Sequence, residues 1–504
     1  MSGPRHPLTV FTPLPPERNG IADYAAMLLG ALAAEYDCAA ACADWLAEAP
    51  PGVPVLDPAL AHRRTGTPGG MHGRVLHQLG NNPGHGFVLQ ALRHHPGVTT
   101  LHDPGLLYLH ETAAGEGREA ILAGMRHGAP PRLAETYGRH LRDHGISTRA
   151  NHLLFDLAGE TLARSRAVVV HSRFARARLR ALHGEAATAH VEVIPHLLPP
   201  LSPPSRAEAR ARLGVPADAF LVCTAGFATA AKRFDWLIAA LDLALGRGPG
   251  APLLWIHAGA ERAEEYPLSA RIAERPALAG RARVTGYLDE AALTDHIAAA
   301  DLLVNLRFPS PGESSGSLAR AFAAGTACAV SATGAYAELP REAVLHLPLA
   351  GAVPALAEAL LALAADPARA RALGEAGRRH AEAEMALPAV AARYRDVIED
   401  SLARPVAAAA APPSPDAPPI TLEAGPGLAA AAVAAALRGI AGPCRLLLAA
   451  PDLAALADLT LDRPGLLAAL LPPWARLARL RVLEGPPRAG LLLDLDLDLG
   501  PPGA

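Results

Sequence analysis

The sequence has few cysteines, few aromatic residues and almost no net charge. Only five of its 504 residues are cysteines, and no pair of them has the spacing of a zinc or redox motif. Aromatic residues make up 4% of the chain, whereas hydrophobic residues make up 51%, which is ample for burial. The formal net charge is −3, so no overall electrostatic field favours nucleic acid as a partner.

Long apolar runs are also missing. The N-terminal residues MSGPRHPLTVF contain no apolar stretch of signal-peptide length. The apolar run Leu428–Leu437 is too short to span a bilayer, and later runs are broken by proline and aspartate. We therefore expect a cytoplasmic protein.

The chain instead shows a regular alternation of short apolar runs with helical patterns. Pro199–Pro204 divides this alternation into two series, and each series predicts a parallel sheet with helices on both faces. The expected fold is α/β with two doubly wound domains and a ligand cleft at the carboxyl ends of the strands. The predicted strands are Leu8–Leu14, Arg74–Gly80, Gly97–Asp103, Ala167–Ser172, His190–His196, Phe220–Gly226, Pro252–Gly259, Ala282–Leu288, Leu302–Leu306, Ala327–Val330 and Leu345–Pro348.

Helices are predicted between these strands and after the last of them. Cys38 and Cys42 are interpreted as neighbours on a helix, and Leu491–Leu499 (LLLDLDLDL) as a strand with one acidic face. The main predicted helices are Ile21–Ala34, Phe174–His183, Phe234–Leu245, Glu290–Ala299, a helix from near Ser315 to Gly325, Ala352–Ala365, Pro367–Met385 and Pro388–Leu402.

The most informative stretch is DLLVNLRFPSPGESSGSLARAFAAGTACAVSATGAYAELP, residues 301–340. A strand, a polar loop and a helix N-terminus make an anion site, because the first helical turn has unpaired N–H groups and a positive dipole end. Gly312 and Gly316 allow a ligand to approach the backbone. Glu313 would repel a phosphate alone, but it suits a ligand that combines a phosphate with hydroxyl donors, such as a nucleotide sugar. The serines of this loop either bond phosphate or cap the helix: Ser314, Ser315 and Ser317.

Two other loops carry candidate donor-binding residues. Lys232 follows Gly226 and a small-residue loop at the start of a helix, where a lysine can meet a diphosphate or simply be solvated. Arg233 stands beside it, and Arg307 directly precedes the polar loop as a further cation. Gly20 opens the first helix, so its backbone either faces a phosphate across the cleft or only forms a turn.

His102 and Asp103 end a predicted strand and are candidate catalytic residues. The histidine can hydrogen-bond a transferred sugar, and the aspartate can orient an acceptor hydroxyl or accept its proton. The alternative is a structural histidine and an aspartate that caps the next turn. Glu338 is interpreted as structural, capping local backbone rather than contacting the donor. The arginines of residues 173–180 are usually a solvated face, and an anionic membrane surface is the less common partner of such a stretch.

Seven segments of the chain, taken in order, resemble the retaining glycosyltransferases of the GT-B fold. That large family includes sucrose synthases and mannosyltransferases, and the similarity is to a bacterial branch. It covers roughly residues 8–402. The segments are TPLPPERNGIADY, LGNNPGH, LHDPGLL, VVVHSRFARARL with VIPH, GFATAAKRFDWLIAAL, RVTGYLDEAALTDHIAAADLLVNL and PSPGESSGSLARAFAAGTACAVSATGAYAELP.

The resemblance implies an enzyme that moves a sugar from a nucleotide-diphosphate donor to an acceptor hydroxyl with retention of configuration, as in polysaccharide biosynthesis. The acceptor is a glycan, a lipid or a small molecule. No cofactor is expected beyond the donor, and no metal, since the chain has no Asp-x-Asp motif at a plausible loop. Catalytic roles would fall to Glu313, Lys232, His102 and Asp103. Donor contacts would come from Gly20, Gly226, Arg233, Arg307, Gly312, Ser314, Ser315, Gly316 and Ser317.

The implied domains are an acceptor domain (1–198), a donor domain (199–385), a helix that packs back on the first domain (386–403), an Ala/Pro-rich linker (404–419) and an extension (420–504). The expected location is cytoplasmic, with contact at the inner membrane face as a secondary possibility.

Two positions depart from the family pattern. The second glutamate of the donor motif is replaced by Ala321, and the common arginine of the phosphate loop by Phe227. These losses support an alternative, a nucleotide-sugar-binding protein that has lost catalysis. A third hypothesis, a dinucleotide oxidoreductase, lacks a G-x-G-x-x-G after the first strand.

Overall fold

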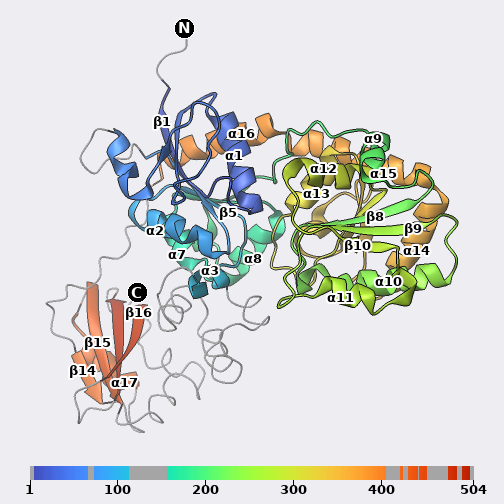
Figure 1. Ribbon diagram of the computed structural model, residues 1–504. Helices are drawn as coiled ribbons and strands as arrows, with labels where there is room; N and C mark the ends of the chain where they lie inside the picture. The colour runs from blue at the N-terminus through green and yellow to red at the C-terminus, as the bar shows by residue number, and fades with distance from the viewer. Residues whose placement is uncertain are drawn as a thin grey trace.

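The computed structural model describes residues 5–65, 73–112, 156–404, 420–423, 430–440, 442–450, 475–484 and 491–499. Two α/β domains lie side by side, and a smaller sheet formed near the C-terminus lies apart from the second domain, as Figure 1 shows. The two domains confirm the predicted fold class. The linker predicted at 404–419 lies outside the described residues, apart from Arg404.

The first domain is built on a seven-stranded sheet in which all neighbouring strands are parallel. Its order is β3-β2-β1-β4-β5-β6-β7, so the order reverses between β1 and β4. In open parallel sheets the loops that follow two such strands diverge and leave a ligand crevice. The strands are β1 (Pro7–Phe11), β2 (Asp37–Ala41), β3 (Val55–Leu56), β4 (Val75–Leu79), β5 (Val98–Leu101), β6 (Ala167–Val170) and β7 (Val191–Val193).

Cys38 and Cys42 correct the helix expected around them. Cys38 lies within β2 and Cys42 directly after it, both buried in the core on one face of the sheet. Alanine favours helices over strands, so DCAAA gives a weak strand signal. Among the described residues of this domain, the helices are α1 (Gly20–Leu32), α2 (Gly86–His94), α3 (Leu107–Thr112), α7 (Gly159–Arg164) and α8 (Arg173–His183).

The second domain repeats this design with a six-stranded parallel sheet. Its order is β10-β9-β8-β11-β12-β13, with the reversal between β8 and β11. The strands are β8 (Phe220–Ala225), β9 (Leu253–Ala258), β10 (Ala282–Val284), β11 (Leu302–Asn305), β12 (Ala327–Ser331) and β13 (Leu345–Leu347). The helices are α9 (Arg206–Leu213), α10 (Phe234–Gly246), α11 (Leu268–Ala273), α12 (Glu290–Ala299), α13 (Gly316–Ala323), α14 (Ala352–Ala365) and α15 (Pro367–Glu384).

One helix of the later sequence completes the core of the first domain. After α15 the chain returns as α16 (Leu387–Ser401), which lies against the first domain in Figure 1. Val390 and Tyr394 are fully buried among β-strand residues of that domain. The Tyr394 hydroxyl lies 3.0 Å from the Tyr24 hydroxyl of α1, and Arg74 donates to Glu399 at 2.8 and 2.7 Å. The two domains are therefore joined by a second chain crossing.

The C-terminal region contains a third, four-stranded sheet of order β14-β15-β17-β16. β17 (Leu491–Leu499) is the strand predicted from LLLDLDLDL, and it pairs antiparallel with both neighbours. The other elements are β14 (Ile420–Glu423), α17 (Ala430–Leu437), β15 (Gly442–Ala450) and β16 (Ala475–Glu484).

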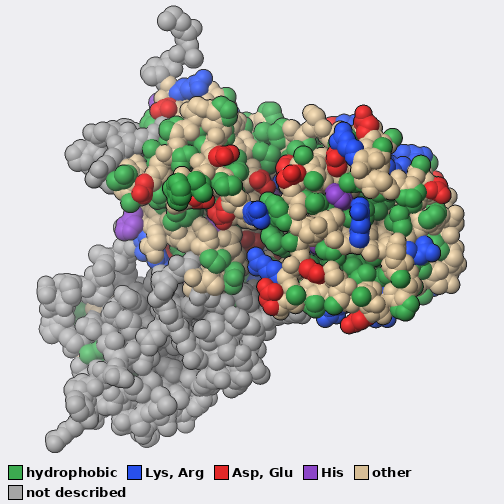
Figure 2. Space-filling view, viewed as in Figure 1, with side chains coloured by type: hydrophobic (Ala, Val, Ile, Leu, Met, Phe, Trp, Pro, Cys, Tyr) green, Lys and Arg blue, Asp and Glu red, His purple; other side chains and the backbone are tan. Residues whose placement is uncertain are grey.

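On the face that Figure 2 shows, positive and negative side chains are mixed over both α/β domains. Within the described ranges, no helix combines the length and the apolar character needed to cross a membrane.

Candidate functional site

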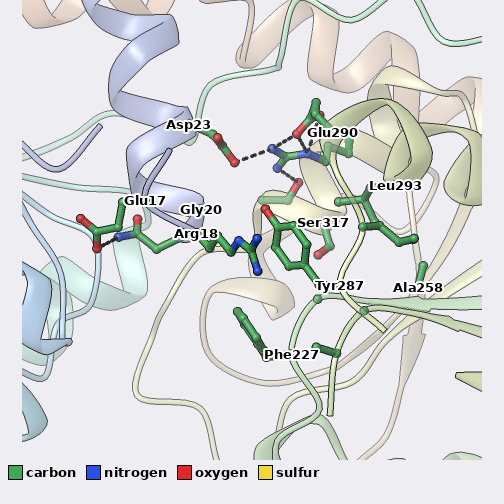
Figure 3. A pocket seen from close by; sticks show the side chains of 17 residues that line it. Glu17, Arg18, Gly20, Asp23, Phe227, Ala258, Tyr287, Glu290, Leu293 and Ser317 are labelled. Carbon is green, nitrogen blue, oxygen red and sulfur yellow. Dashed lines mark hydrogen bonds and ion pairs between the residues drawn. The ribbon is translucent and has the colours of Figure 1, made fainter. Parts of the chain in front are cut away.

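A pocket of about 270 Å³ lies between the two domains. The first domain contributes the loop after β1 and the start of α1, and the second contributes the loops after β8, β9 and β10 and the start of α13 (Figure 3). The β1 and β8 loops stand at the two points where strand order reverses, as expected for ligand sites of parallel sheets. The pocket is lined by Glu17, Arg18, Asn19, Gly20, Asp23, Gly226, Phe227, Ala258, Gly259, Ala260, Tyr287, Leu288, Glu290, Leu293, Gly316, Ser317 and Arg320.

The pocket floor depends on close packing of two backbone loops. A Cβ atom at Gly259 would lie 2.2 Å from the carbonyl oxygen of Gly226, closer than any real contact. Position 259 therefore admits no side chain, and the two loops present bare backbone to the pocket. Gly259 was not singled out from the sequence, although it follows a buried strand as Gly226 does.

Helix α13 points its N-terminus toward this floor. Ser315 is the N-cap, and its hydroxyl accepts a hydrogen bond from the Leu318 N–H at 3.3 Å. Gly316 and Ser317 line the pocket, whereas Ser314 is half-buried and outside the lining. Of the three serines, Ser315 thus has the capping role, and Ser317 faces the space where an anion would meet the helix dipole.

Lys232 lies beside the same helix end, near enough to Arg307 to be affected by its charge. The Lys232 ammonium donates to the Ala225 carbonyl at 2.7 Å and lies close to Gly226. Burial, followed by the nearby charge of Arg307, lowers the pKa of Lys232 well below its usual range. Such a lysine gains from an anionic partner, because a phosphate would offset both effects.

Glu313 is held within the polar loop. Its carboxylate accepts hydrogen bonds from the Ser310 hydroxyl at 2.8 Å and the Gly312 N–H at 3.2 Å. The Arg307 guanidinium lies 3.5 Å away. Gly312 has φ +113°, and a Cβ there would meet Phe174 and Pro104 of the first domain at 3.0–3.3 Å. The loop that carries Glu313 is therefore seated against the opposite domain.

Asp103 lies across the interface from this loop. Its carboxylate accepts a hydrogen bond from the Asn81 N–H at 2.9 Å. Burial raises the pKa of Asp103 to about 6, and the charge of Glu313 contributes in the same direction. The two predicted catalytic carboxylates, one from each domain, are thus near enough to interact electrostatically.

His102 belongs to a buried histidine cluster. Its Nε2 lies 2.7 Å from the Gln78 side-chain oxygen and its Nδ1 lies 3.1 Å from His171 Nε2. Tyr24 packs edge-on against the His102 ring, with centroids 4.8 Å apart. Burial, followed by His171 and His196, lowers the pKa of His102 well below its usual range. His102 is therefore neutral at physiological pH and serves as a hydrogen-bonding group.

Arg233 is the one predicted donor-binding cation directed elsewhere. Its guanidinium lies 4.3 Å from the Trp236 ring centre and donates to Asp235 at 2.5 Å. Gly20, by contrast, lines the pocket at the start of α1, where the Asn19 side chain caps the helix.

Sequence reasoning missed an ion-pair network that spans the pocket. Arg320 on α13 donates to Glu290 at 2.9 and 2.7 Å, and its guanidinium lies 3.4 Å from Asp23 on α1. In Figure 3, Asp23 and Glu290 stand on opposite sides of that guanidinium. Arg320 is buried, so each of these charges is compensated within the network. The only sequence signal was a lone arginine in an otherwise apolar helix.

A second interdomain contact joins an arginine to an aromatic ring. The Arg18 guanidinium lies 4.3 Å from the ring centre of Tyr287, and Figure 3 shows it reaching across the pocket. Within the second domain, the Arg262 guanidinium lies 5.1 Å from the ring centre of Phe227. A guanidinium therefore lies near the position where the family pattern has an arginine and this chain has phenylalanine.

Glu338 contacts the backbone of the other domain rather than its own. Its carboxylate accepts hydrogen bonds from the backbone N–H groups of Arg173 and Phe174, the first residues of α8. The Arg173 side chain also lies 3.4 Å from it. A carboxylate of the second domain therefore caps a helix of the first.

The described residues contain no group of three or more His, Cys, Asp or Glu side chains arranged to hold a metal ion.

Two facing Rossmann-like domains with this interdomain pocket define a GT-B type fold. Residues 219–366, which lie within the second domain, match the family model for glycosyl transferases group 1.

Comparisons of the full-length chain also find proteins that are similar to it. The chain is 29% identical over 332 residues to D-inositol 3-phosphate glycosyltransferase 1 of Catenulispora acidiphila, covering 64% of this chain and 71% of that protein. Sucrose-phosphate synthase from Thermosynechococcus elongatus is similar in structure, with a TM-score of 0.53, 21% identity and coverage of 79% and 100%. Anabaena HepE, solved in complex with UDP-glucose, gives a TM-score of 0.54 at 13% identity, covering 78% and 99%.

Proposed function

We propose that this protein transfers a sugar from a nucleotide-diphosphate sugar to an acceptor hydroxyl, with retention of configuration and without a metal ion, in the synthesis of a glycan. The observation that carries the proposal is the interdomain pocket, which is lined by bare backbone at Gly226 and Gly259 and by the start of α13. Lys232 lies close to Gly226, and the adjacent loop holds Glu313 with Arg307 3.5 Å away. The group 1 domain match and the UDP-glucose complex of HepE support a nucleotide sugar as donor.

The donor would lie mainly on the second domain. The diphosphate would meet the N-terminus of α13 at Ser317 and the charges of Lys232 and Arg307, which together stabilise the departing nucleotide. Glu313 would accept hydrogen bonds from sugar hydroxyls, and its anchoring by Ser310 keeps the carboxylate in place.

The acceptor would approach from the first domain. Asp103 is close to Glu313 and can orient the acceptor hydroxyl, while neutral His102 can hydrogen-bond the sugar. Attack from the same side as the departing diphosphate would give retention. The acceptor itself is proposed as a glycan, a lipid or a small molecule, and no cofactor is assigned beyond the donor.

The alternative is a nucleotide-sugar-binding protein without turnover. The observation that favours it is Ala321, which is fully buried in the core of the second domain and brings no polar atom to the pocket. Under this hypothesis the donor binds but no bond is broken.

Measuring donor binding and turnover on the same protein distinguishes the two candidate functions. The purified chain is titrated calorimetrically with UDP-, GDP- and ADP-sugars, and release of nucleoside diphosphate is followed with a panel of sugar, polyol and lipid acceptors. We expect the protein to bind a nucleotide sugar and to release the nucleoside diphosphate only when an acceptor is present. NMR of the product should show that the anomeric configuration is retained. K232A should lose both binding and release. E313A should lose release by at least tenfold, because it removes a charge-assisted sugar contact. Tight binding with no release from any acceptor would select the alternative.

A further inference from the structure

Among the described residues, three carboxylates line the interdomain pocket: Glu17, Asp23 and Glu290. Glu17 is occupied by the Asn19 amide, which donates to it at 2.5 Å. Asp23 belongs to the first domain and is more loosely held, 3.4 Å from Arg320. Glu290 belongs to the second domain and is the most firmly oriented of the three.

Arg320 fixes the Glu290 carboxylate without using all its acceptor capacity. The guanidinium approaches both oxygens: Nε shares its hydrogen between Oε1 at 2.9 Å and Oε2 at 3.1 Å, and a terminal nitrogen donates to Oε2 at 2.7 Å. A carboxylate oxygen accepts at two lone-pair positions, so Oε1 keeps one, and at Oε2 the 3.1 Å contact is the weaker half of a shared hydrogen bond. The Glu290 side chain is 44% exposed, whereas Arg320 is 7% exposed. A carboxylate with remaining acceptor capacity, mainly at Oε1, therefore lines the pocket in an orientation that Arg320 fixes.

Besides Arg320, the surroundings of Glu290 include an apolar and aromatic wall, and the Arg18 guanidinium lies 4.3 Å from the ring centre of Tyr287 in that wall. Tyr287, Leu288 and Leu293 line the same end of the pocket, and the Tyr287 ring is half exposed. Lys232 lies instead next to Gly226 and Ser317, at the phosphate-binding part of the site. Lys232 thus stands next to the pocket floor at Gly226, and the part of the pocket around Glu290 combines an apolar and aromatic wall with a fixed carboxylate.

We propose that Glu290 binds the vicinal ribose hydroxyls of the nucleotide, with Arg320 as its positioning residue. This inference rests on the proposed function and adds the residue that holds the nucleoside. Two adjacent hydroxyls can each donate to one oxygen of a carboxylate, whereas a phosphate would be repelled by it. The neighbouring wall formed by Tyr287 and the two leucines suits the planar base joined to that ribose. Helix α13 offers no such group at Ala321, which is buried.

The test compares ribonucleotides with their 2′-deoxy counterparts, which lack one hydroxyl, in the wild-type chain and in E290Q, which lacks the charge of Glu290. Dissociation constants are measured by calorimetry for UDP, ADP and GDP and for dUDP, dADP and dGDP. We expect the full-length chain to prefer the ribose form of its nucleotide by roughly tenfold or more, the effect of one hydrogen bond to a charged group. E290Q should reduce that preference to less than about threefold.

Two further variants are compared with E290Q: E290D, which moves the carboxylate, and D295N, which is the control. E290D keeps the charge but withdraws it by one methylene, so it should also lose most of the preference. Asp295 lies on the same helix, outside the pocket lining and paired with Arg212 at 2.9 Å, so D295N should retain the preference. A change in folding alone would weaken both ligands equally and leave their ratio intact.

An undiminished ratio in both Glu290 variants, or a wild-type ratio near one, overturns the assignment of Glu290 while nucleotide binding itself stands. If the wild-type chain binds none of the six nucleotides, the proposed function is refuted, and this inference with it.

Discussion

At the scale of a single side chain, the ionisation of Asp103 is subject to opposing effects. Its carboxylate is removed from water and faces the charge of Glu313 across the domain interface, and both effects disfavour ionisation. The Asn81 N–H is the partner that favours the charged form. A group with a pKa of about 6 changes charge within the range in which enzymes are assayed. Its protonation should therefore be visible in kinetics.

We predict that kcat/KM falls as the pH drops below about 6, because protonated Asp103 can no longer accept a hydrogen bond from the acceptor hydroxyl. D103N should lower turnover by about a hundredfold or more and abolish this acid limb. The same variant should melt at a higher temperature at pH 7.5. Since its pKa is raised in the folded state, ionised Asp103 destabilises the fold above that pKa, by roughly 2–3 kcal/mol. A D103N enzyme with the wild-type pH profile would contradict the assignment.

Lys232 should make donor binding depend on pH. Its pKa is lowered by burial and by Arg307, so the neutral amine is populated at lower pH than in a solvated lysine, and a bound diphosphate favours the ammonium. Binding of a nucleotide-diphosphate sugar should therefore take up protons and tighten as the pH falls, by at most about tenfold per pH unit. Calorimetry in two buffers of different ionisation enthalpy measures the uptake. K232R should bind without uptake, and equal uptake by both proteins would refute the prediction.

At the scale of elements, helix α8 begins with caps from two domains. The Ser172 hydroxyl accepts from the Ala175 N–H at 3.0 Å, and Glu338 accepts from the two preceding N–H groups. A carboxylate at a helix N-terminus is favoured by the dipole as well as by these bonds. The cap therefore joins the domains as well as completing the helix.

We predict that E338A shifts the protein toward a more open arrangement of the domains. Loss of such a cap costs about 1–2 kcal/mol, which is a five- to thirtyfold change in an equilibrium between arrangements. The measurements are the radius of gyration from small-angle scattering and the KM for the donor, both of which should rise. Glu342, four residues later and exposed, gives the control E342A, which should leave both unchanged. If E338A and E342A behave alike, the contact does not hold the domains together.

The elements show which parts of the structure were predictable. Helices α12 and α14 were predicted with their observed bounds, and the buried strands β8 and β9 within a residue or two, because their apolar periodicity is set locally. β2 was missed because its alanines carry no strand signal.

The candidate site likewise contains residues that the local sequence predicts and residues that it does not. Residues at strand ends, such as Gly226 and Asp103, are marked by local sequence. The cap that Glu338 provides to Arg173 joins residues 165 positions apart, and the Glu290–Arg320 pair comes from two different helices. Such partners are set by how the elements pack, and no local spacing encodes them.

At the scale of the whole molecule, buried neutral histidines occur in both domains. Burial lowers the pKa of His77, His85 and His171 to about 4, and that of His196 and His257 to about 3. The unfolded chain binds protons at these sites below about pH 6.5, whereas the folded chain does not until near pH 4 or lower. Acid therefore favours unfolding.

We predict that the free energy of unfolding falls steeply between pH 6.5 and pH 4. Each buried histidine contributes up to about 1.4 kcal/mol per pH unit to this slope. Urea titrations followed by circular dichroism at half-unit steps measure it, and H171N with H196N should flatten the curve. A urea midpoint of unfolding that stays constant from pH 7 to pH 4.5 would show that these histidines are not held neutral in the folded protein.

Helix α16 has a consequence for how the protein is made. Its residues 387–401 fill part of the core of the first domain, yet they are synthesised after the entire second domain. A growing chain on the ribosome therefore carries an incomplete first domain, with the apolar surface around Tyr24 uncovered, until some four hundred residues have emerged. Expression of residues 1–198 alone should give an insoluble product. Supplying 387–401 through a short fused linker should restore solubility, because the missing helix then arrives with the sheet that it covers.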